Sequence, residues 1–328
     1  MGYTRKHSYN PKICKKKGEF NLMKINIKLL TNKGKGLRNL TKQSTAYIYL
    51  SPTLILMILL LVLPITMVIG YSFFDNVIIN KNPIFIGLEN YIKVLTDKDF
   101  MVAIKNTTFF VCISVIAHLV LGMFFATLLN TSYLGKKIKA FFRVIYVLPW
   151  MFTAAVIAIL WKMMLNPNGV INYLLQVFNF TSTNIAWLSS RSVALIAVTI
   201  INIWAGYPFY MISILAGLQG IPKDLYEASS IDGANAIKQF LFITIPQLKP
   251  ILISLITLDF VWTIQQFALI WMTTGGGPIN ATETLSTYIY KQGFSSFQYS
   301  QASASAVIVL LVCTIIAVFY AKQQKARS

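Results

Sequence analysis

Four long intervals without a charged side chain constrain the fold of this sequence more than any other feature. The intervals lie between Lys42 and Asp75, Lys105 and Lys136, Arg191 and Lys223, and Lys291 and Lys322. A helix needs about 20 mostly apolar residues to cross a bilayer, and each interval is longer than that. With 56% hydrophobic and 12% charged residues, the composition is not that of a soluble protein.

Two further apolar runs, Val144–Trp161 and Ile251–Met272, are close to the spanning length, and only the second contains a charge, Asp259. The sequence therefore predicts an all-α membrane protein with six transmembrane helices, the first starting near Ala46 and the last ending at Tyr320. We expect three parts. Residues 1–45 form a basic N-terminal arm, residues 46–321 form the six-span domain, and residues 322–328 form a basic tail.

The basic residues are distributed unevenly. Of 29 Lys and Arg, 12 precede Gln43, and most of the others cluster in 136–143, in 223–249 and after Tyr320. Cytoplasmic segments of membrane proteins carry this excess, so both termini and the loop 218–250 are expected in the cytoplasm. The arm is more compatible with anionic lipid headgroups than with nucleic acid, for which the sequence contains no motif. Between the first two spans, FIGLENYIKVL fits either a short amphipathic helix or a solvated loop.

The loop 218–250 is amphipathic and lies between two spans. Pro222 followed by Lys223-Asp224 is a helix start, and a first short helix is expected to end near Asp232-Gly233, a pair that favours positive φ. A second short helix, roughly 234–243, is expected to stop before Pro246. These two helices predict a compact knob that a partner protein can approach closely. An ordinary helical hairpin between two spans is the alternative.

Glu227-Ala228-Ser229, then Gly233, then Ile243-Thr244-Ile245-Pro246 resembles the EAA loop of bacterial ABC importer permeases, with Ser229 and Ile245 as the two departures. Several weaker motifs resemble the carbohydrate subclass, the maltose and glycerol-3-phosphate type. They are Gly-Leu-x-Asn-Tyr after the first span, Leu148-Pro149-Trp150, Thr-x-Gly-Gly-Pro ending at Pro278, and Tyr288-Ile289-Tyr290.

The resemblance implies a type I ABC importer fold and a permease subunit that takes up a sugar, an oligosaccharide or a glycerol phosphate. It implies contact of the loop with a separate dimeric ABC ATPase, through the residues Glu227, Ala228, Ser229, Asp232, Gly233, Ala234 and Pro246. It also implies a second permease subunit, an extracytoplasmic solute-binding protein and a bacterial cytoplasmic membrane. No nucleotide-binding loop is present in the sequence, so this chain is expected to be non-catalytic and to bind no cofactor, while the ATPase uses ATP and Mg²⁺.

Polar side chains within the fourth and fifth spans are candidates for lining the substrate pathway, since polar groups at this depth are costly without a role. They are Asn202, Tyr207, Asp259, Trp262, Gln265 and Gln266. Asp259, Trp262 and Gln266 share one face if the helix continues through them, with Gln265 beside it. Packing is the alternative, in which Asp259 pairs with a neighbouring helix and Gln266 forms an interhelical bond.

Two other function classes fit less well. An ion-coupled secondary transporter would use Asp259 as the coupling carboxylate, but the sequence contains no convincing inverted repeat. A membrane enzyme would need a clustered nucleophile, base or metal-ligand set. The cysteines and histidines are scattered, so we predict no metal site, and we expect His7 and His118 to be isolated side chains without a role.

Overall fold

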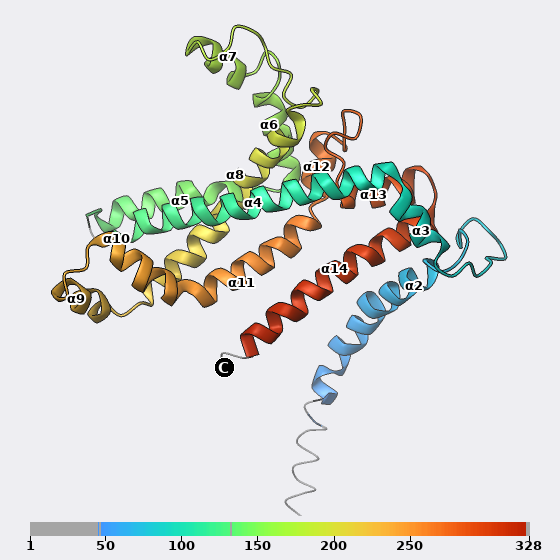
Figure 1. Cartoon of the computed structure of the whole chain (residues 1–328), viewed down its shortest axis with the longest axis horizontal. Helices are drawn as coiled ribbons and strands as arrows, with labels where there is room; N and C mark the ends of the chain where they lie inside the picture. The colour runs from blue at the N-terminus through green and yellow to red at the C-terminus, as the bar shows by residue number, and fades with distance from the viewer. Residues whose placement is uncertain (1–44, 46, 132, 326–328) are drawn as a thin grey trace, which may run out of the picture. The chain divides into compact units, whose positions relative to one another are not determined.

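The computed structural model describes residue 45 and residues 47–131 and 133–325, and all regular structure in them is helical apart from one isolated bridge between Phe74 and Phe85 (Figure 1). The predicted arm therefore lies almost wholly outside the described residues. The chain divides into two compact units, one ending at Met67 and one from Val68 onward. The first long helix, Tyr47–Tyr71, contains a π-helical turn, η1 (Ile58–Val62), followed by α2 (Leu63–Tyr71).

The second unit contains the remaining elements. In chain order they are α3 (Glu89–Thr96), α4 (Lys98–Asn130), α5 (Lys136–Met151), α6 (Ala154–Met164), α7 (Val170–Val177), α8 (Ala194–Gln219), α9 (Lys223–Ile231), α10 (Ala236–Gln239), η2 (Phe240–Thr244), α11 (Ile245–Ile264), α12 (Ala268–Thr273), α13 (Leu285–Tyr290), η3 (Lys291–Ser295) and α14 (Tyr299–Lys325). The helix α3 confirms the helical interpretation of FIGLENYIKVL.

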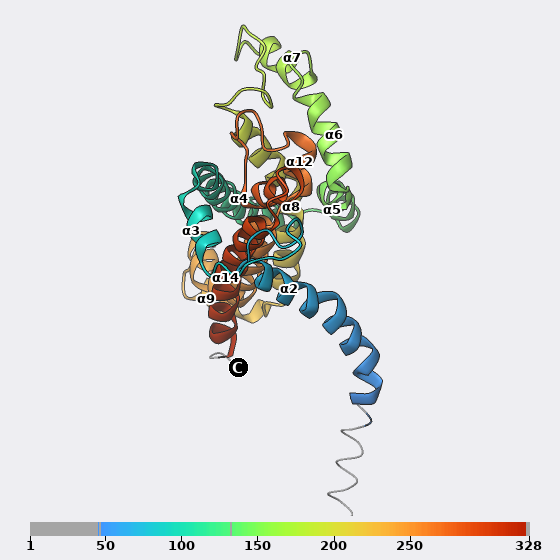
Figure 2. The same ribbon diagram turned by 90° about the vertical axis from the view of Figure 1, so that its right-hand side faces the viewer.

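Five described helices are long and apolar enough to cross a membrane, and a sixth span results if the bent pair α5 and α6 is counted as one. The all-α, multi-span prediction is confirmed, but the third span is not the single straight helix expected from 144–161. It bends by 98° after Met151. Phe152 and Thr153 are extended, and the Thr153 hydroxyl accepts from the Val156 N–H and so starts α6 afresh. Figures 1 and 2 show α6 and α7 projecting to one side of α8 and α12.

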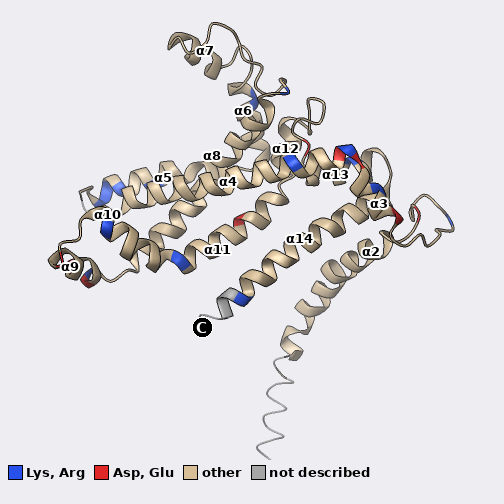
Figure 3. Cartoon of the chain, in the orientation of Figure 1, with Lys and Arg blue, Asp and Glu red and all other residues tan. Residues whose placement is uncertain are grey.

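The fifth span also differs from the prediction. Its helix begins in the loop and runs over Ala236–Ile264, and then ends, so that α12 is a separate short helix. Figure 3 shows few charged residues along the middles of α4, α8 and α14, and basic residues at the start of α5 and on α10. This pattern matches the asymmetry seen in the sequence.

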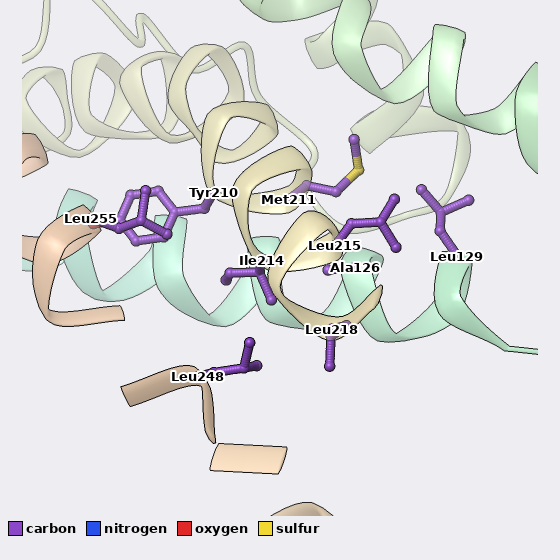
Figure 4. Close-up of a cluster of buried hydrophobic side chains, with 9 residues drawn as sticks. All are labelled: Ala126, Leu129, Tyr210, Met211, Ile214, Leu215, Leu218, Leu248 and Leu255. Atoms are coloured by element: carbon purple, nitrogen blue, oxygen red, sulfur yellow. The ribbon is translucent and has the colours of Figure 1, made fainter. Parts of the chain in front are cut away.

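The core of the second unit lies where α8 packs along α4 and α11. Figure 4 shows apolar side chains of the three helices meeting there, with Tyr210, Met211 and Ile214 of α8 fully buried. Gly122 of α4 faces Tyr210 so closely that a Cβ on Gly122 would overlap the Tyr210 Cβ and would lie 3.0 Å from the Met211 nitrogen. Small residues at a helix crossing allow the backbones of membrane helices to approach in this way.

The loop between α12 and α13 is tied to the first half of α4. The Asn106 amide donates to the carbonyls of Asn280 and Glu283, at 3.1 and 2.9 Å, and the Thr107 hydroxyl accepts from the Leu285 N–H at 2.9 Å. Glu283 is only 2% exposed and pairs with Lys291. Burial raises the pKa of Glu283, while Lys291 opposes that rise. The Thr-x-Gly-Gly-Pro segment thus belongs to a hydrogen-bonded, partly buried loop.

Candidate functional site

A cavity with a volume of about 210 Å³ lies among α4, α5, α6, α8, α11 and α12. Four of the six residues predicted to line a pathway contribute to its wall, namely Asn202, Asp259, Trp262 and Gln266. The wall also includes His118, which was not predicted. Binding cavities of this kind are mostly apolar, with a few converging polar groups.

Asp259 is buried, and both of its carboxylate oxygens have partners. Oδ2 lies 2.8 Å from Nδ1 of His118 on α4, and Oδ1 accepts from the Thr263 hydroxyl at 3.0 Å, one turn along α11. The second ring nitrogen of His118, Nε2, lies 3.1 Å from the backbone carbonyl of Asn202 on α8. The imidazole therefore connects three helices beside the cavity.

The predicted single helical face is wrong for Gln266, because α11 ends at Ile264 and Gln265 is its C-cap. Gln266 nevertheless reaches the cavity, and its amide donates to the Asn202 side chain at a long 3.4 Å. The interhelical pairs of the packing alternative, Asp259 with His118 and Gln266 with Asn202, are thus present in residues that also line the cavity. Gln265 is exposed and does not line it.

Tyr207 also lies outside the cavity wall. Its ring is 8% exposed, and its hydroxyl donates to the Tyr146 carbonyl of α5 at 3.2 Å. These contacts give Tyr207 a packing position between α8 and α5. Asn202, in contrast, faces the cavity while its amide donates to the buried Ser114 hydroxyl of α4 at 3.0 Å.

Aromatic rings form the other part of the wall. Phe209 lies between Trp150 and Trp262, with ring centroids 5.9 and 5.4 Å apart. Both tryptophans line the cavity and remain half exposed, at 49% and 53%. Flat rings next to amide and carboxylate groups are suited to a ligand that has both an apolar face and hydroxyl groups.

His118 corrects our expectation of an isolated histidine. It is 2% exposed, and its ring contacts Gly206 so closely that a Cβ on Gly206 would lie 2.5 Å from the ring carbon Cε1. The available signal in the sequence was that His118 is the one ionisable imidazole in the charge-free interval between Lys105 and Lys136. Ionisable groups inside a span usually have a partner, so the sequence does indicate a partner for His118.

The loop 218–250 contains the predicted bend. The first helix, α9, ends at Ile231, and Gly233 has φ +75°, in the left-handed region that favours glycine. The prediction that Pro246 ends a short second helix is wrong. After α10 the chain forms the π-helical turn η2 and continues directly into α11 with Pro246 in its first turn. Because η2 joins α11 without a break, Pro246 lies inside the continuous helix Ala236–Ile264, where it removes one backbone N–H donor.

A hydrogen-bond network that the sequence did not reveal holds α9 against α10. The Gln239 amide donates to the Tyr226 carbonyl and to the hydroxyls of Ser229 and Ser230, at 3.2, 3.1 and 2.9 Å. The Tyr226 hydroxyl lies 2.9 Å from that of Thr244. We call the segment 223–244 the knob, because these bonds make it one compact structure.

The outer surface of the knob carries the other predicted loop residues. Glu227, Ala228, Asp232 and Gly233 are exposed, and Ser229 and Ala234 are half-buried; Pro246, just beyond the knob, is exposed. Three large apolar side chains also lie open, namely Ile231, Ile237 and Phe242, at 87, 69 and 76% exposure. Among the described residues, no group of three His, Cys, Asp or Glu is placed to hold a metal ion.

Comparisons with known proteins find related sequences and a similar fold. Residues 118–327 match the family model described as "Binding-protein-dependent transport system inner membrane component". A probable ABC transporter permease of Sinorhizobium fredii is 35% identical over 84% of this chain and 88% of its own length. The trehalose/maltose transport system permease of Thermococcus litoralis is 31% identical over 86% and 94%. The crystal structure of a bacterial ABC transporter that imports the acidic polysaccharide alginate covers 88% of this chain and 98% of the solved chain, with a TM-score of 0.76 at 23% identity.

Proposed function

Because the chain belongs to the family of inner membrane components of binding-protein-dependent transport systems, the ABC importer permeases, we propose that it forms half of the translocation pathway of an ATP-driven carbohydrate importer. The cavity is the observation that carries this proposal. It combines Asn202, Asp259 and Gln266 with the half-exposed rings of Trp150 and Trp262. The relative named for trehalose and maltose transport supports the substrate class.

The knob supports a proposed coupling role. Its hydrogen bonds make it a compact structure, so a partner can move it as one body, and its open apolar side chains need a partner surface to exclude water. We infer that the partner is a dimeric ABC ATPase, which uses ATP and Mg²⁺, and that Glu227 accepts hydrogen bonds from a basic group of the ATPase. In this proposal the permease chain itself is non-catalytic and holds no cofactor.

The remaining partners follow from the family. A second permease completes the pathway, a solute-binding protein delivers the substrate from outside, and lipid surrounds the spans; nucleic acid has no part in the proposal. Both termini and the knob are proposed to lie in the cytoplasm, in line with the basic residues near α5 and α10. The secondary-transporter alternative finds no support, since the family is that of binding-protein-dependent systems.

The experiment that tests this function changes one cavity side chain and one knob side chain. Gln266→Ala should alter which labelled sugar is taken up by reconstituted transporter, with assembly unchanged, because the side chain lines the cavity and makes only one long protein bond. Glu227→Lys should abolish uptake while the binding protein still binds sugar. If Gln266→Ala impairs assembly and leaves the substrate profile unchanged, Gln266 is a packing residue.

A further inference from the structure

The cavity holds one acidic group and no basic side chain. Among its lining residues, Asp259 is the only carboxylate, and neither Lys nor Arg occurs. Helices α8 and α12 carry no basic residue at all, whereas α4, α5, α6 and α11 do. Those basic residues are Lys98, Lys105, Lys136, Lys137, Lys139, Arg143, Lys162 and Lys249, and none of them lines the cavity.

The basic residues of α4 and α11 are also distant along their helices. Lys105 precedes His118 by 13 residues and Lys249 precedes Asp259 by ten. At a rise of 1.5 Å per residue, these separations are about 20 and 15 Å. On α5 and α6, Arg143 and Lys162 are exposed. No cation among the residues that line the cavity is therefore placed to meet a negative ligand there.

The hydrogen bonds of His118 fix the charge that the wall itself presents. A backbone carbonyl only accepts, so the 3.1 Å contact of Nε2 with the Asn202 oxygen places a hydrogen on Nε2. The 2.8 Å contact between Nδ1 and Asp259 Oδ2 needs one more hydrogen between the two atoms. On whichever atom that hydrogen resides, His118 and Asp259 together carry a net charge of zero.

We propose that this cavity accepts uncharged carbohydrates and excludes sugar acids and sugar phosphates. The inference rests on the proposed function, in which the cavity is part of the substrate pathway. A hydroxyl can bond to the amides of Asn202 and Gln266, and a sugar ring can pack on Trp262. At this wall a carboxylate or phosphate would lose its water without meeting a cation of this chain, which is strongly unfavourable. His118 acts as a specificity residue, because it neutralises Asp259 and leaves no free positive charge.

The test measures binding to the complete transporter in lipid nanodiscs, without the binding protein, so that the selectivity of that protein does not enter. The uncharged probes are maltotriose, cellotriose and raffinose. The acidic probes are trigalacturonate, trimannuronate and sn-glycerol 3-phosphate. Binding is followed by tryptophan fluorescence, and the Trp262→Phe variant identifies the part of the signal that comes from the cavity.

We expect a Trp262-dependent change with at least one uncharged probe and at least about tenfold weaker binding of every acidic one, a factor that corresponds to 1.4 kcal/mol. Gln266→Lys should raise the affinity for an acidic probe relative to the uncharged one by a similar factor. Gln265→Lys is the matched control, since it adds the same charge at the next position but off the cavity wall, and it should leave the ratio unchanged.

The outcomes separate the two proposals. Binding of an acidic probe to the unaltered transporter as tightly as any uncharged probe overturns the charge selection and leaves the importer function standing. If Gln265→Lys and Gln266→Lys change the ratio of the two affinities equally, the charge selection is also overturned, because the added charge would then act from outside the cavity. If no saccharide of either kind changes the Trp262 signal or is taken up, the carbohydrate pathway itself fails, and the selection fails with it.

Discussion

Gly233 offers a test of whether the bend of the knob transmits force. Its φ of +75° is costly for other residues, yet a Cβ added there would meet no atom within 4 Å. A substitution is therefore penalised by backbone strain alone and not by a clash. That strain is roughly 1–2 kcal/mol for alanine, and about 1–3 kcal/mol covers such outliers generally, with β-branched valine among the worst. Asparagine adopts this region more readily and should cost less.

One or two kcal/mol changes a conformational ratio by a factor of about 5–30. If the bend holds the knob in the shape that the ATPase engages, coupling should fall in the order glycine, asparagine, alanine, valine. The assay is ATPase activity stimulated by the binding protein, measured beside sugar uptake in reconstituted membranes. Gly135→Val is the matched control, because Gly135 has φ −62° and equally open space around it.

Two results would refute this reasoning. Full stimulation and uptake in Gly233→Val would mean that the loop is only a connector between spans. A Gly233→Asn variant as damaged as Gly233→Val would mean that any side chain is excluded at this point, so that the limit is the space in the partner groove and not the backbone conformation. In either case the permease alone should lose no more stability than this backbone strain, because Gly233 is exposed and no clash adds to it.

Three further predictions concern other parts of the chain. A reporter fused after Lys238 should be cytoplasmic and one inserted near Gly276 external, and the reverse result at either site would contradict the proposed orientation. Gly206→Ala should displace the His118 ring, lower the free energy of unfolding by about 1–3 kcal/mol and impair uptake. An unchanged melting temperature would show that the contact between Gly206 and the His118 ring is loose. Burial raises the pKa of Glu283 above 4.5, so the folded chain holds that proton more firmly than the unfolded chain. The free energy of unfolding of the wild type should therefore fall relative to that of Glu283→Gln as pH rises from about 4.5. A difference between the two proteins that does not change with pH would contradict this.

Much of the fold could be predicted because the length of each apolar run in the sequence indicates whether a helix can span the membrane. The helix Ala194–Gln219 lies within the charge-free interval between Arg191 and Lys223, as predicted. The third span could not be predicted as a bent pair, because the apolar run continues through Phe152 and Thr153 without any interruption in hydropathy. The break depends on a local hydroxyl cap, which composition does not reveal.

The cavity was predictable only in part, for a related reason. Asp259 and Gln266 could be predicted as pathway residues because they are polar residues in an apolar stretch. The prediction that they share one helical face required a continuous helix, but α11 ends at Ile264. The partner of Asp259 lies 141 positions earlier in the chain, so no spacing rule connects His118 with it. Such a pair emerges only once α4 and α11 pack together.

The continuous helix from Ala236 to Ile264 also has a rotational consequence. It joins the knob to the cavity wall, and each residue of an α-helix turns the chain by about 100°. The angular phase between Ile237 on the knob and Asp259 in the wall is thus set by a residue count, to which the wide turn η2 contributes. Removing one residue from η2 would rotate one end against the other by roughly a quarter turn or more. The number of residues in this helix therefore sets the relative orientation of the knob and the cavity wall as well as the distance between them.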